Sequence, residues 1–464
     1  MDTVLNIYLQ VISPVHIGCD EVYEPTGFVI DESRKKLIAF DPLRFIKALS
    51  EDERKKFIEL CMEGTIASIP RLYGFMCRKK ISGREVDIAH GLTANYQRVK
   101  SLAKSKDESM IVQELNQFAI SRTAFNPHTE KPYIPGSSIK GSLRTAYLNK
   151  LAKAKKIAGW RGNAKDLEIK LLDGSFETDP FRMVKVSDML PIGNAPTKIV
   201  YAVNKKKNKS KFEARGPFQI LEVIQPGAVF EGTVNIQAPD PQARVKNPIT
   251  EESLLQSLKN FYGAAFDSEQ KLMKDIGADQ GVYIKTKESF NNLLDSKAFI
   301  VRLGRHSGAE AVTIKDNRSI KIMQGRRNSP KYSDAATTIW LASENSNPSS
   351  NEGLQPFGWV VLSLEPIASP FADSPETFIT SKPIPEIPKP QPPPEIKPLD
   401  KFIASLKPLR PQDAGRINSV IDDALKKLET DEEKRRFARA VQEHMGSVFK
   451  KSKARNKLEP FLGS

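Results

Sequence analysis

The chain opens with a strict alternation of apolar and polar side chains. In the segment Leu5-Asn-Ile-Tyr-Leu-Gln-Val11 every second residue is apolar, which is the spacing of a half-buried β-strand. The pattern ends at Ser13-Pro14. We therefore predict that the first element is a strand with one face on a hydrophobic core.

Similar apolar runs predict further strands along the chain. They lie at residues 28–30, 37–40, 182–186, 199–203, 218–223, 298–303, 337–341 and 359–364. Between the second and third of these regions, residues 51–130 are charged and have mostly helical periodicity, so they are predicted to form a helical insertion. Further helices are predicted at about 144–157 and 254–266, and Asp41-Pro42 is typical of a helix start.

The end of the chain has a different pattern. Prolines recur at nearly every second or third position between residues 383 and 398, which favours an extended linker without a packed core. Beyond it, Ile417, Ile421 and Leu428, and then Phe437, Val441 and Met445, follow helical spacing. We predict an α+β protein with domains at residues 1–240 and 241–372, a linker at 373–398 and a helical module at 399–464.

Composition narrows the class of partner. Lys and Arg total 71 against 56 Asp and Glu, which gives a formal net charge of +15 and favours an acidic polymer, with nucleic acid first and an anionic membrane second. No apolar stretch approaches the roughly 20 residues of a membrane span. The first residues lack the features of a secretory signal, and Cys19, Cys61 and Cys77 lack metal-ligand spacing. We expect a cytoplasmic protein with no cofactor, no metal and no membrane partner.

The stretch Pro132-Tyr-Ile-Pro-Gly-Ser-Ser-Ile-Lys-Gly-Ser-Leu-Arg144 carries the strongest candidate chemistry. It enters a helix whose N-terminal N–H groups could hold a phosphate, and Gly136 would let that phosphate approach the backbone. The candidate contacts are Gly136, Ser137, Ser138, Lys140, Gly141 and Arg144. The spacing is not that of a nucleotide-hydrolysing P-loop, and an ordinary Ser-capped helix with solvated lysines is the alternative.

Two further loops share this chemistry. After the strand at 298–303 come Gly304, Arg305, His306, Ser307 and Gly308, where arginine and glycine suit a kinked RNA backbone. Arg326 and Arg327 repeat the basic character nearby, with a solvated turn as the alternative.

The first strand runs into Ser13-Pro-Val-His-Ile-Gly18, which places His16 and Gly18 on a loop. A histidine there could act as a general acid or base. A packed loop histidine is the alternative, because no partner residue stands beside it in the sequence.

These loops resemble those of the RAMP superfamily of CRISPR-associated proteins, and within it the fifth Csm subunits of type III-A effector complexes. The resemblance rests on the segments 13–18, 132–141, 186–188 and 304–308. It implies tandem ferredoxin-like, RRM-related RAMP domains whose glycine-rich loops grip CRISPR RNA. It also implies a subunit that caps the 3′ end of the guide beside other Csm backbone subunits and supports guide maturation.

Two features depart from the family pattern. Paired aromatic residues of the RRM type are missing, and the linker and helical tail lie outside the resemblance. The tail is predicted to dock a neighbouring subunit or a maturation nuclease, and a mobile appendage without a specific role is the alternative. The leading hypothesis is a non-catalytic guide-binding subunit. The alternatives are a RAMP endoribonuclease that uses His16 or His306, and a protein that binds anionic membranes or acts as a general scaffold.

Overall fold

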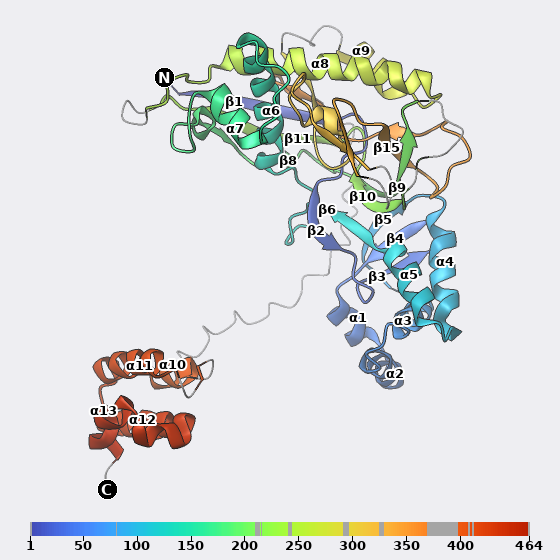
Figure 1. Ribbon diagram of the computed structural model, residues 1–464. Helices are drawn as coiled ribbons and strands as arrows, with labels where there is room; N and C mark the ends of the chain where they lie inside the picture. The colour runs from blue at the N-terminus through green and yellow to red at the C-terminus, as the bar shows by residue number, and fades with distance from the viewer. Residues whose placement is uncertain are drawn as a thin grey trace. The chain divides into compact units, whose positions relative to one another are not determined.

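The structure is a computed structural model. It describes residues 2–79, 81–208, 214, 216–239, 244–290, 297–323, 329–368, 398–406, 409–410 and 413–462. The chain divides into two compact units, Met1–Thr377 and Phe378–Ser464, called here the first and second unit (Figure 1). The predicted contacts Arg326 and Arg327 and the proline-rich segment 373–397 lie outside the described residues.

Six strands form the first sheet. They are β1 (Thr3–Val11), β7 (Val184–Val186), β8 (Leu190–Pro191), β11 (Val229–Ile236), β12 (Ala298–Arg302) and β17 (Trp359–Ser363). Their order is β12-β17-β1-β11-β7, with β8 also paired to β11. In the chain, the helix α6 (Gly136–Ala154) lies between β1 and β7, and α8 (Glu251–Asp275) follows β11 and precedes β12 and β17. When the strands inserted between them, β12 included, are set aside, β1, α6, β7, β11, α8 and β17 follow the order of a βαββαβ unit.

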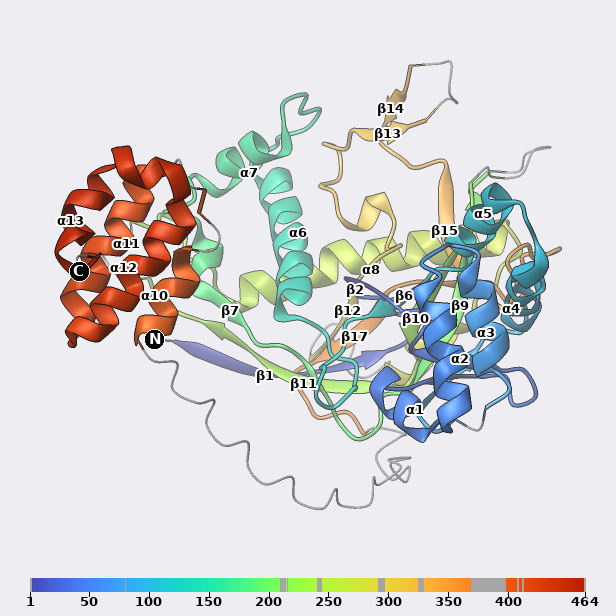
Figure 2. The same cartoon turned by 90° about the horizontal axis from the view of Figure 1, so that it is seen from below.

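The alternation in β1 explains which face of the first sheet is covered. Ile7, Leu9 and Val11 are each no more than 1% exposed, and they lie on the face that carries α6 and α8. Figure 2 shows these helices on the far side of β1 and β11. On α6, Ile139, Leu143 and other residues at helical spacing are buried. Burying such a side chain stabilises the fold by about 1.5–3 kcal/mol, so helices and sheet hold one another in place.

Nine strands form the second sheet. They are β2 (Gly18–Val22), β3 (Phe28–Asp31), β4 (Lys36–Ala39), β5 (Arg84–Ile88), β6 (Ile120–Thr123), β9 (Thr197–Lys206), β10 (Gln219–Ile224), β15 (Thr338–Ser343) and β16 (Gln355–Pro356). The order is β2-β6-β10-β9-β5-β4-β3, and β15 pairs with β9 and β16. The chain passes from β1 to β2 and from β10 to β11, and a bridge between Val15 and Ile224 joins these two crossings. The two sheets are therefore joined through the same two connections, from β1 to β2 and from β10 to β11.

Helices cover the part of the second sheet formed by β3, β4 and β5. They are α1 (Pro42–Ala48), α2 (Glu51–Met62), α3 (Ser68–Met76), α4 (Leu92–Ser101), η1 (Leu102–Lys104) and α5 (Glu108–Phe118). As predicted, Asp41 caps α1 by accepting a hydrogen bond from the Leu43 N–H at 2.8 Å. Residues 51–130 are not a separate helical insertion, because β5 and β6 within them are strands of the second sheet.

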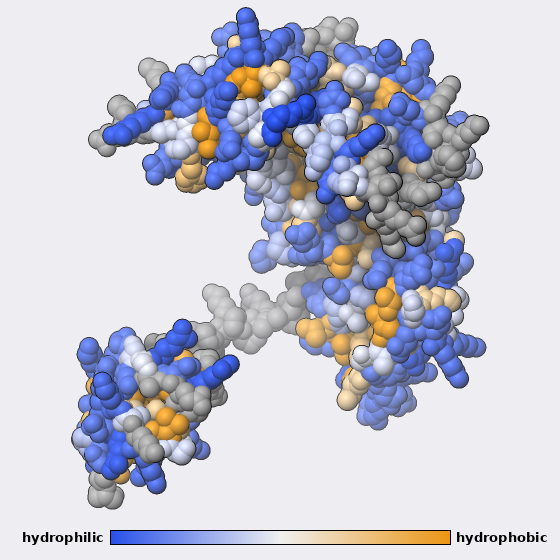
Figure 3. Space-filling model, in the orientation of Figure 1, coloured by the Kyte–Doolittle hydropathy of each residue, from blue (hydrophilic) through white to orange (hydrophobic). Residues whose placement is uncertain are grey.

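Large apolar side chains are exposed on the first two of these helices. Leu43 is 67% exposed, Ile58 45% and Met62 81%, and Figure 3 shows hydrophobic areas at the end of the first unit that carries these helices. We call these three residues the insertion patch. Exposed apolar side chains on neighbouring helices are compatible with a contact to another protein.

The boundary expected at residue 240 does not separate two sheets. The strands β12 and β17 from the expected second domain complete the first sheet beside β1, and β15 pairs with β9 in the second sheet. Alternation along a strand identifies the strand but does not identify its partner. The sequence therefore predicted many of the strands. It could not show which strands pair, and so it divided them into domains that the structure does not have.

The remaining elements of the first unit are peripheral or connecting. They are α7 (Ala164–Leu172), η2 (Pro180–Met183), α9 (Gly281–Phe290), η4 (Ala309–Ala311) and the hairpin of β13 (Ile320–Ile322) and β14 (Lys331–Ser333). The helix α7 packs on α6, and α9 packs on α8. On the opposite face of the first sheet, no helix among the described residues covers β7, β11 and the adjoining half of β1.

The second unit is helical. It consists of α10 (Pro398–Leu406), α11 (Ala414–Lys427), α12 (Asp431–Met445), η5 (Gly446–Lys451) and α13 (Lys453–Leu462). Its own core contains the residues at helical spacing, including Ile417, Ile421, Phe437 and Val441, each fully buried. None of the described helices in either unit has the length and apolar character that crossing a lipid bilayer requires.

Candidate nucleic-acid interface

The loop after β1 and the loop after β12 are in direct contact. The backbone N–H of Arg305 donates a hydrogen bond to the carbonyl oxygen of His16 at 2.8 Å. Gly304 has a φ of +78°, and a Cβ atom at this position would lie 2.4 Å from the same carbonyl oxygen. Only glycine allows this approach, so the glycine of one motif is required by the position of the other.

The segment 132–141 and the start of α6 are linked by hydrogen bonds to both of these loops. Ala124 links it to the first loop, because its N–H donates to the Ile17 carbonyl at 2.8 Å and its own carbonyl accepts from Tyr133 at 3.2 Å. On α6, the Ser142 hydroxyl donates to the Arg302 carbonyl at 2.8 Å, just before the third loop. The structure thus brings together segments 13–18, 132–141 and 304–308, and we call them the loop junction.

His16 lies inside the loop junction and not on its surface. It is 1% exposed, and its Nδ1 lies 2.7 Å from the Glu222 carbonyl oxygen, to which it can donate a hydrogen bond. Burial lowers the pKa of this imidazole below its ordinary value of 6.5. A neutral, packed histidine holds the loop against β10, whereas Gly18 beyond it is exposed.

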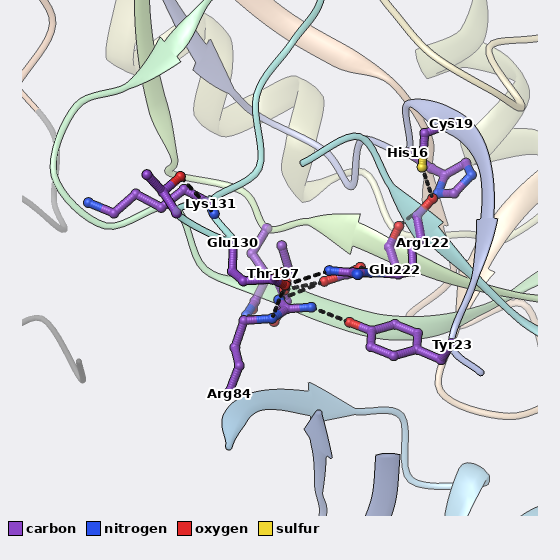
Figure 4. A network of polar contacts seen from close by, with 11 residues as sticks. His16, Cys19, Tyr23, Arg84, Arg122, Glu130, Lys131, Thr197 and Glu222 are labelled. Atoms are coloured by element: carbon purple, nitrogen blue, oxygen red, sulfur yellow. Dashed lines mark hydrogen bonds and ion pairs between the residues drawn. The ribbon is translucent and has the colours of Figure 1, made fainter. Parts of the chain in front are cut away.

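Next to His16, a network of charged side chains occupies one face of the second sheet (Figure 4). The Glu222 carboxylate accepts hydrogen bonds from Arg84 at 3.0 Å and from the Thr197 hydroxyl at 2.8 Å. Arg122 pairs with Glu130 at 2.9 Å and lies over the Phe125 ring. Two arginines face two carboxylates, so this cluster is close to charge balance and suits a structural role better than phosphate binding.

His306 is also held by packing. Its ring lies 4.7 Å from that of Trp340 and 5.4 Å from that of Phe357, and its Nε2 lies 3.2 Å from Gln219 Oε1. Burial, with the neighbouring Arg305 and His16, lowers its pKa from 6.5 to about 3. The packed ring therefore favours its neutral form at physiological pH.

The exposed part of this third loop is formed by its other residues. Gly304, Arg305 and Gly308 are exposed, whereas the Ser307 hydroxyl is buried and donates to the carbonyls of Leu303 and Gly304. Arg305 forms no ion pair with any carboxylate in the described part of the chain. Its guanidinium is therefore available to an anion from solution.

At the start of α6, Gly136 is fixed by contact with the loop between β7 and β8. Its N–H donates to the Asp188 carboxylate at 2.8 Å, and a Cβ atom there would lie 2.3 Å from the Val186 carbonyl oxygen. A carboxylate at a helix N-terminus occupies the place where a phosphate would bind. The sequence analysis expected a phosphate on this amide, and in the structure Asp188 is its acceptor.

Farther along α6 the predicted contacts differ in their surroundings. Ser137 and Gly141 are exposed and Ser138 is half-buried. No atom outside the helix lies within 4 Å of the position of a Gly141 Cβ, so the fold does not require glycine there. Arg144 is bound by two carboxylates, Glu168 at 2.6 Å and Asp179 at 2.8 Å.

Lys140 is half-buried, and partial burial together with the nearby Lys185 lowers the pKa of its ammonium group. Lys185 is an exposed residue of β7 that the sequence analysis did not select. The only signal for it was its polar character between Val184 and Val186. Two like charges held close together are stabilised by an anion, so this pair marks the basic edge of the loop junction.

No group of three or more His, Cys, Asp or Glu side chains is arranged to hold a metal ion in the described residues. A βαββαβ sheet with glycine-rich, basic loops gathered at one place is typical of RNA-associated proteins. The chain belongs to the RAMP superfamily, whose profile matches residues 8–279.

Proteins similar to this chain include one sequence relative and two solved structures. The chain is 23% identical over 416 residues to the "CRISPR system Cms protein Csm5" of Methanocaldococcus jannaschii, which covers 78% of this chain and 89% of that protein. A chain of a cryo-EM "Csm-crRNA-target RNA ternary complex" matches 78% of this chain over its whole length, with 18% identity and a TM-score of 0.50. The crystal structure of T. onnurineus Csm5 matches 76% of this chain and 99% of its own, with 17% identity and a TM-score of 0.41.

Proposed function

We propose that this chain is a CRISPR RNA-binding subunit of a type III-A Csm effector complex, and that it caps the 3′ end of the guide and supports its maturation. The observation that carries the proposal is the meeting of three separate glycine-bearing segments at the loop junction. The relatives support the assembly, because one is a Csm5 protein and another is a chain of a complex with crRNA. The 3′ position rests on the family resemblance.

In this proposal some residues of the loop junction contact RNA, and others hold the loops in position. The RNA backbone contacts the side chains of Lys140, Lys185 and Arg305. It also contacts the exposed main chain at Gly18, Ser137, Gly141, Gly304 and Gly308. Phosphates favour such sites because the exposed glycines let an RNA chain approach the backbone and basic side chains lie beside them. The buried His16, Gly136 and Ser307 and the ion-paired Arg144 hold these loops in position.

Binding fits this geometry better than cleavage by a loop histidine. General acid–base catalysis needs an accessible pair with pKa values near the working pH. His16 and His306 are packed, and burial lowers the pKa of both. An RNA placed on the exposed glycines would meet Arg305 and not an imidazolium.

Assembly with neighbouring subunits is supported by the insertion patch, Leu43, Ile58 and Met62, on a surface away from the loop junction. We propose that another Csm subunit covers it. Docking of a maturation nuclease on the second unit stays a prediction.

The proposal is tested by co-expressing the full chain with a CRISPR array transcript and sequencing the RNA that co-purifies. RNA ends clustered at the 3′ side of the guide are expected. Random cellular RNA would leave a basic RNA-binding protein without the capping role, and the absence of RNA under low salt would overturn the proposal.

A further inference from the structure

The face of the first sheet opposite α6 and α8 presents side chains in rows across three strands. In antiparallel pairs, directly opposed residues point to the same face. Tyr8 of β1 lies opposite Glu231 of β11, which in turn lies opposite Leu190 of β8. The next rows contain Asn6 with Thr233, and then Val4 with Asn235 and Lys185.

This face is not a core surface. Asn6, Glu231 and Lys185 are exposed, and Tyr8, Thr233 and Asn235 are half-buried. The neighbouring residues of β1 that point the other way, Ile7 and Leu9, are almost completely buried. In the described parts of the chain no helix covers this face at β1, β11, β7 and β8.

The side chains on this face suit unpaired bases. Tyr8 offers a flat ring, and the next row places the Asn6 amide and the Thr233 hydroxyl near it as donors and acceptors. Val4 is 60% exposed and Leu190 55%, so apolar groups border the polar centre. Single-stranded RNA is recognised by such a mixture of aromatic stacking and hydrogen bonds to base edges.

The charged residues indicate how a bound RNA chain would be oriented on this face. Lys185 lies at the β7 edge, close enough to Lys140 of the loop junction that the two ammonium groups affect each other. Glu231 beside Tyr8 repels phosphate from the centre of the face. A chain that leaves the loop junction would therefore keep its phosphates at the lysine edge and turn its bases toward Tyr8.

The other end of the same row of β1 opens into a cavity of about 290 Å³. Gln10, two residues after Tyr8 and on the same face, lines it together with Lys285, Ser289 and Gln355. The side chains from Val4 to Gln10 span about 20 Å at the rise of a strand, which is enough for a few nucleotides.

We infer that the helix-free face of the first sheet is a second binding surface for single-stranded RNA, on which a base stacks against Tyr8. This inference rests on the proposed function and extends it, because it assigns bases to the sheet and phosphates to the loop junction. In this inference Tyr8 stacks on a base, although paired RRM-type aromatic residues are missing from the sequence.

The test compares two probes on the full chain: a uridine oligoribonucleotide and an abasic ribose-phosphate chain of equal length. Tyr8→Ala is expected to weaken uridine binding by about 5- to 100-fold, the range for loss of one stacked base, and to leave abasic binding unchanged. Tyr8→Phe should keep the wild-type affinity. Tyr332→Ala, which removes a tyrosine 64% exposed on β14, is the matched control and should also bind as wild type.

Equal uridine affinities for Tyr8→Ala and wild type would overturn the inference and leave the proposed function intact. Equal losses on both probes would also overturn it, because they would show a loss of fold or charge and not of stacking. If the wild-type chain binds neither probe, the proposed function itself fails.

Discussion

The backbone N–H of Arg305 and the carbonyl oxygen of His16 form a 2.8 Å hydrogen bond between opposite ends of the first unit's sequence. The bond fixes the loop after β12 on the loop after β1. The two loops therefore form one structural feature, and a change that separates them should affect both stability and RNA binding.

Gly304→Ala should destabilise the first unit more than Gly308→Ala. Both residues have positive φ, +78° and +81°, and both variants carry backbone strain. Only at Gly304 would the new Cβ meet a backbone oxygen, 2.4 Å away, whereas at Gly308 the nearest atom lies 3.6 Å away. The overlap should add about 1–3 kcal/mol.

The three tryptophans, at positions 160, 340 and 359, all belong to the first unit. Tryptophan fluorescence during urea unfolding therefore measures the free energy of unfolding of this unit. Equal destabilisation by the two glycine variants would contradict the close packing of Gly304 on His16.

Gly136→Ala and Gly141→Ala should have opposite effects on stability. A Gly136 Cβ would lie 2.3 Å from the Val186 carbonyl oxygen, so this variant should lose about 1–3 kcal/mol. Gly141 lies in the interior of α6 with free space around it, so alanine there should add about 0.5–1 kcal/mol.

If RNA approaches the backbone at Gly141, the more stable Gly141→Ala protein should bind guide RNA more weakly. Affinity and urea unfolding are measured on the same preparations. A variant that gains stability and keeps full affinity would remove Gly141 from the proposed contact surface.

Removal of Lys140 and Arg305, two basic side chains of the loop junction, should change the salt dependence of RNA binding. For single strands the slope of log affinity against log salt is about −0.7 per neutralised phosphate. The double variant Lys140→Ala, Arg305→Ala should reduce its magnitude by about 1.4. A control variant, Lys47→Ala with Lys56→Ala on α1 and α2, removes two exposed lysines and should keep the wild-type slope.

His306 should make the first unit sensitive to acid. Its pKa is about 3 in the folded protein and near 6.5 when unfolded. Only the unfolded state takes up a proton between these values, so stability is complete above about pH 6.5 and falls as the pH is lowered toward 3. His16 acts in the same direction.

Between pH 7 and pH 5 the His306 contribution should be on the order of 1 kcal/mol, allowing for partial solvent screening. The variant His306→Asn tolerates the φ of +64° and removes the titrating group. Its loss of stability over this pH range, measured by fluorescence, should be smaller than that of wild type. Parallel pH profiles would show that the ring is protonated in the folded protein.

Local periodicity predicted much of the fold. The alternation at 5–11 and the apolar runs at 199–203 and 359–364 lie in β1, β9 and β17. The short strands β2, β5 and β6 were missed because charged residues such as Glu21, Arg84 and Arg122 hide their pattern. The eight-residue strand β11, which pairs with β1, was missed as well. The pairing of strands could not be read, since it depends on contacts between distant parts of the chain.

The sequence selected segments that the structure brings together, but it did not indicate what each of their residues contacts. A glycine required by a neighbouring backbone, as at Gly136, looks the same in sequence as a glycine required by a ligand. Likewise, a buried histidine such as His16 cannot be distinguished from an exposed one. Lys185 was missed because its neighbour Lys140 is remote in the chain.

The completion of the first sheet by β12 and β17 also affects how the protein is made. On the ribosome, β1 and β11 emerge long before residues 298–363, so β1 waits with an unpaired edge until most of the chain has been translated. Folding of the first unit must therefore finish late in synthesis. A chain stopped near residue 240 would expose that edge to aggregation, so the complete first sheet depends on residues translated after all its other strands.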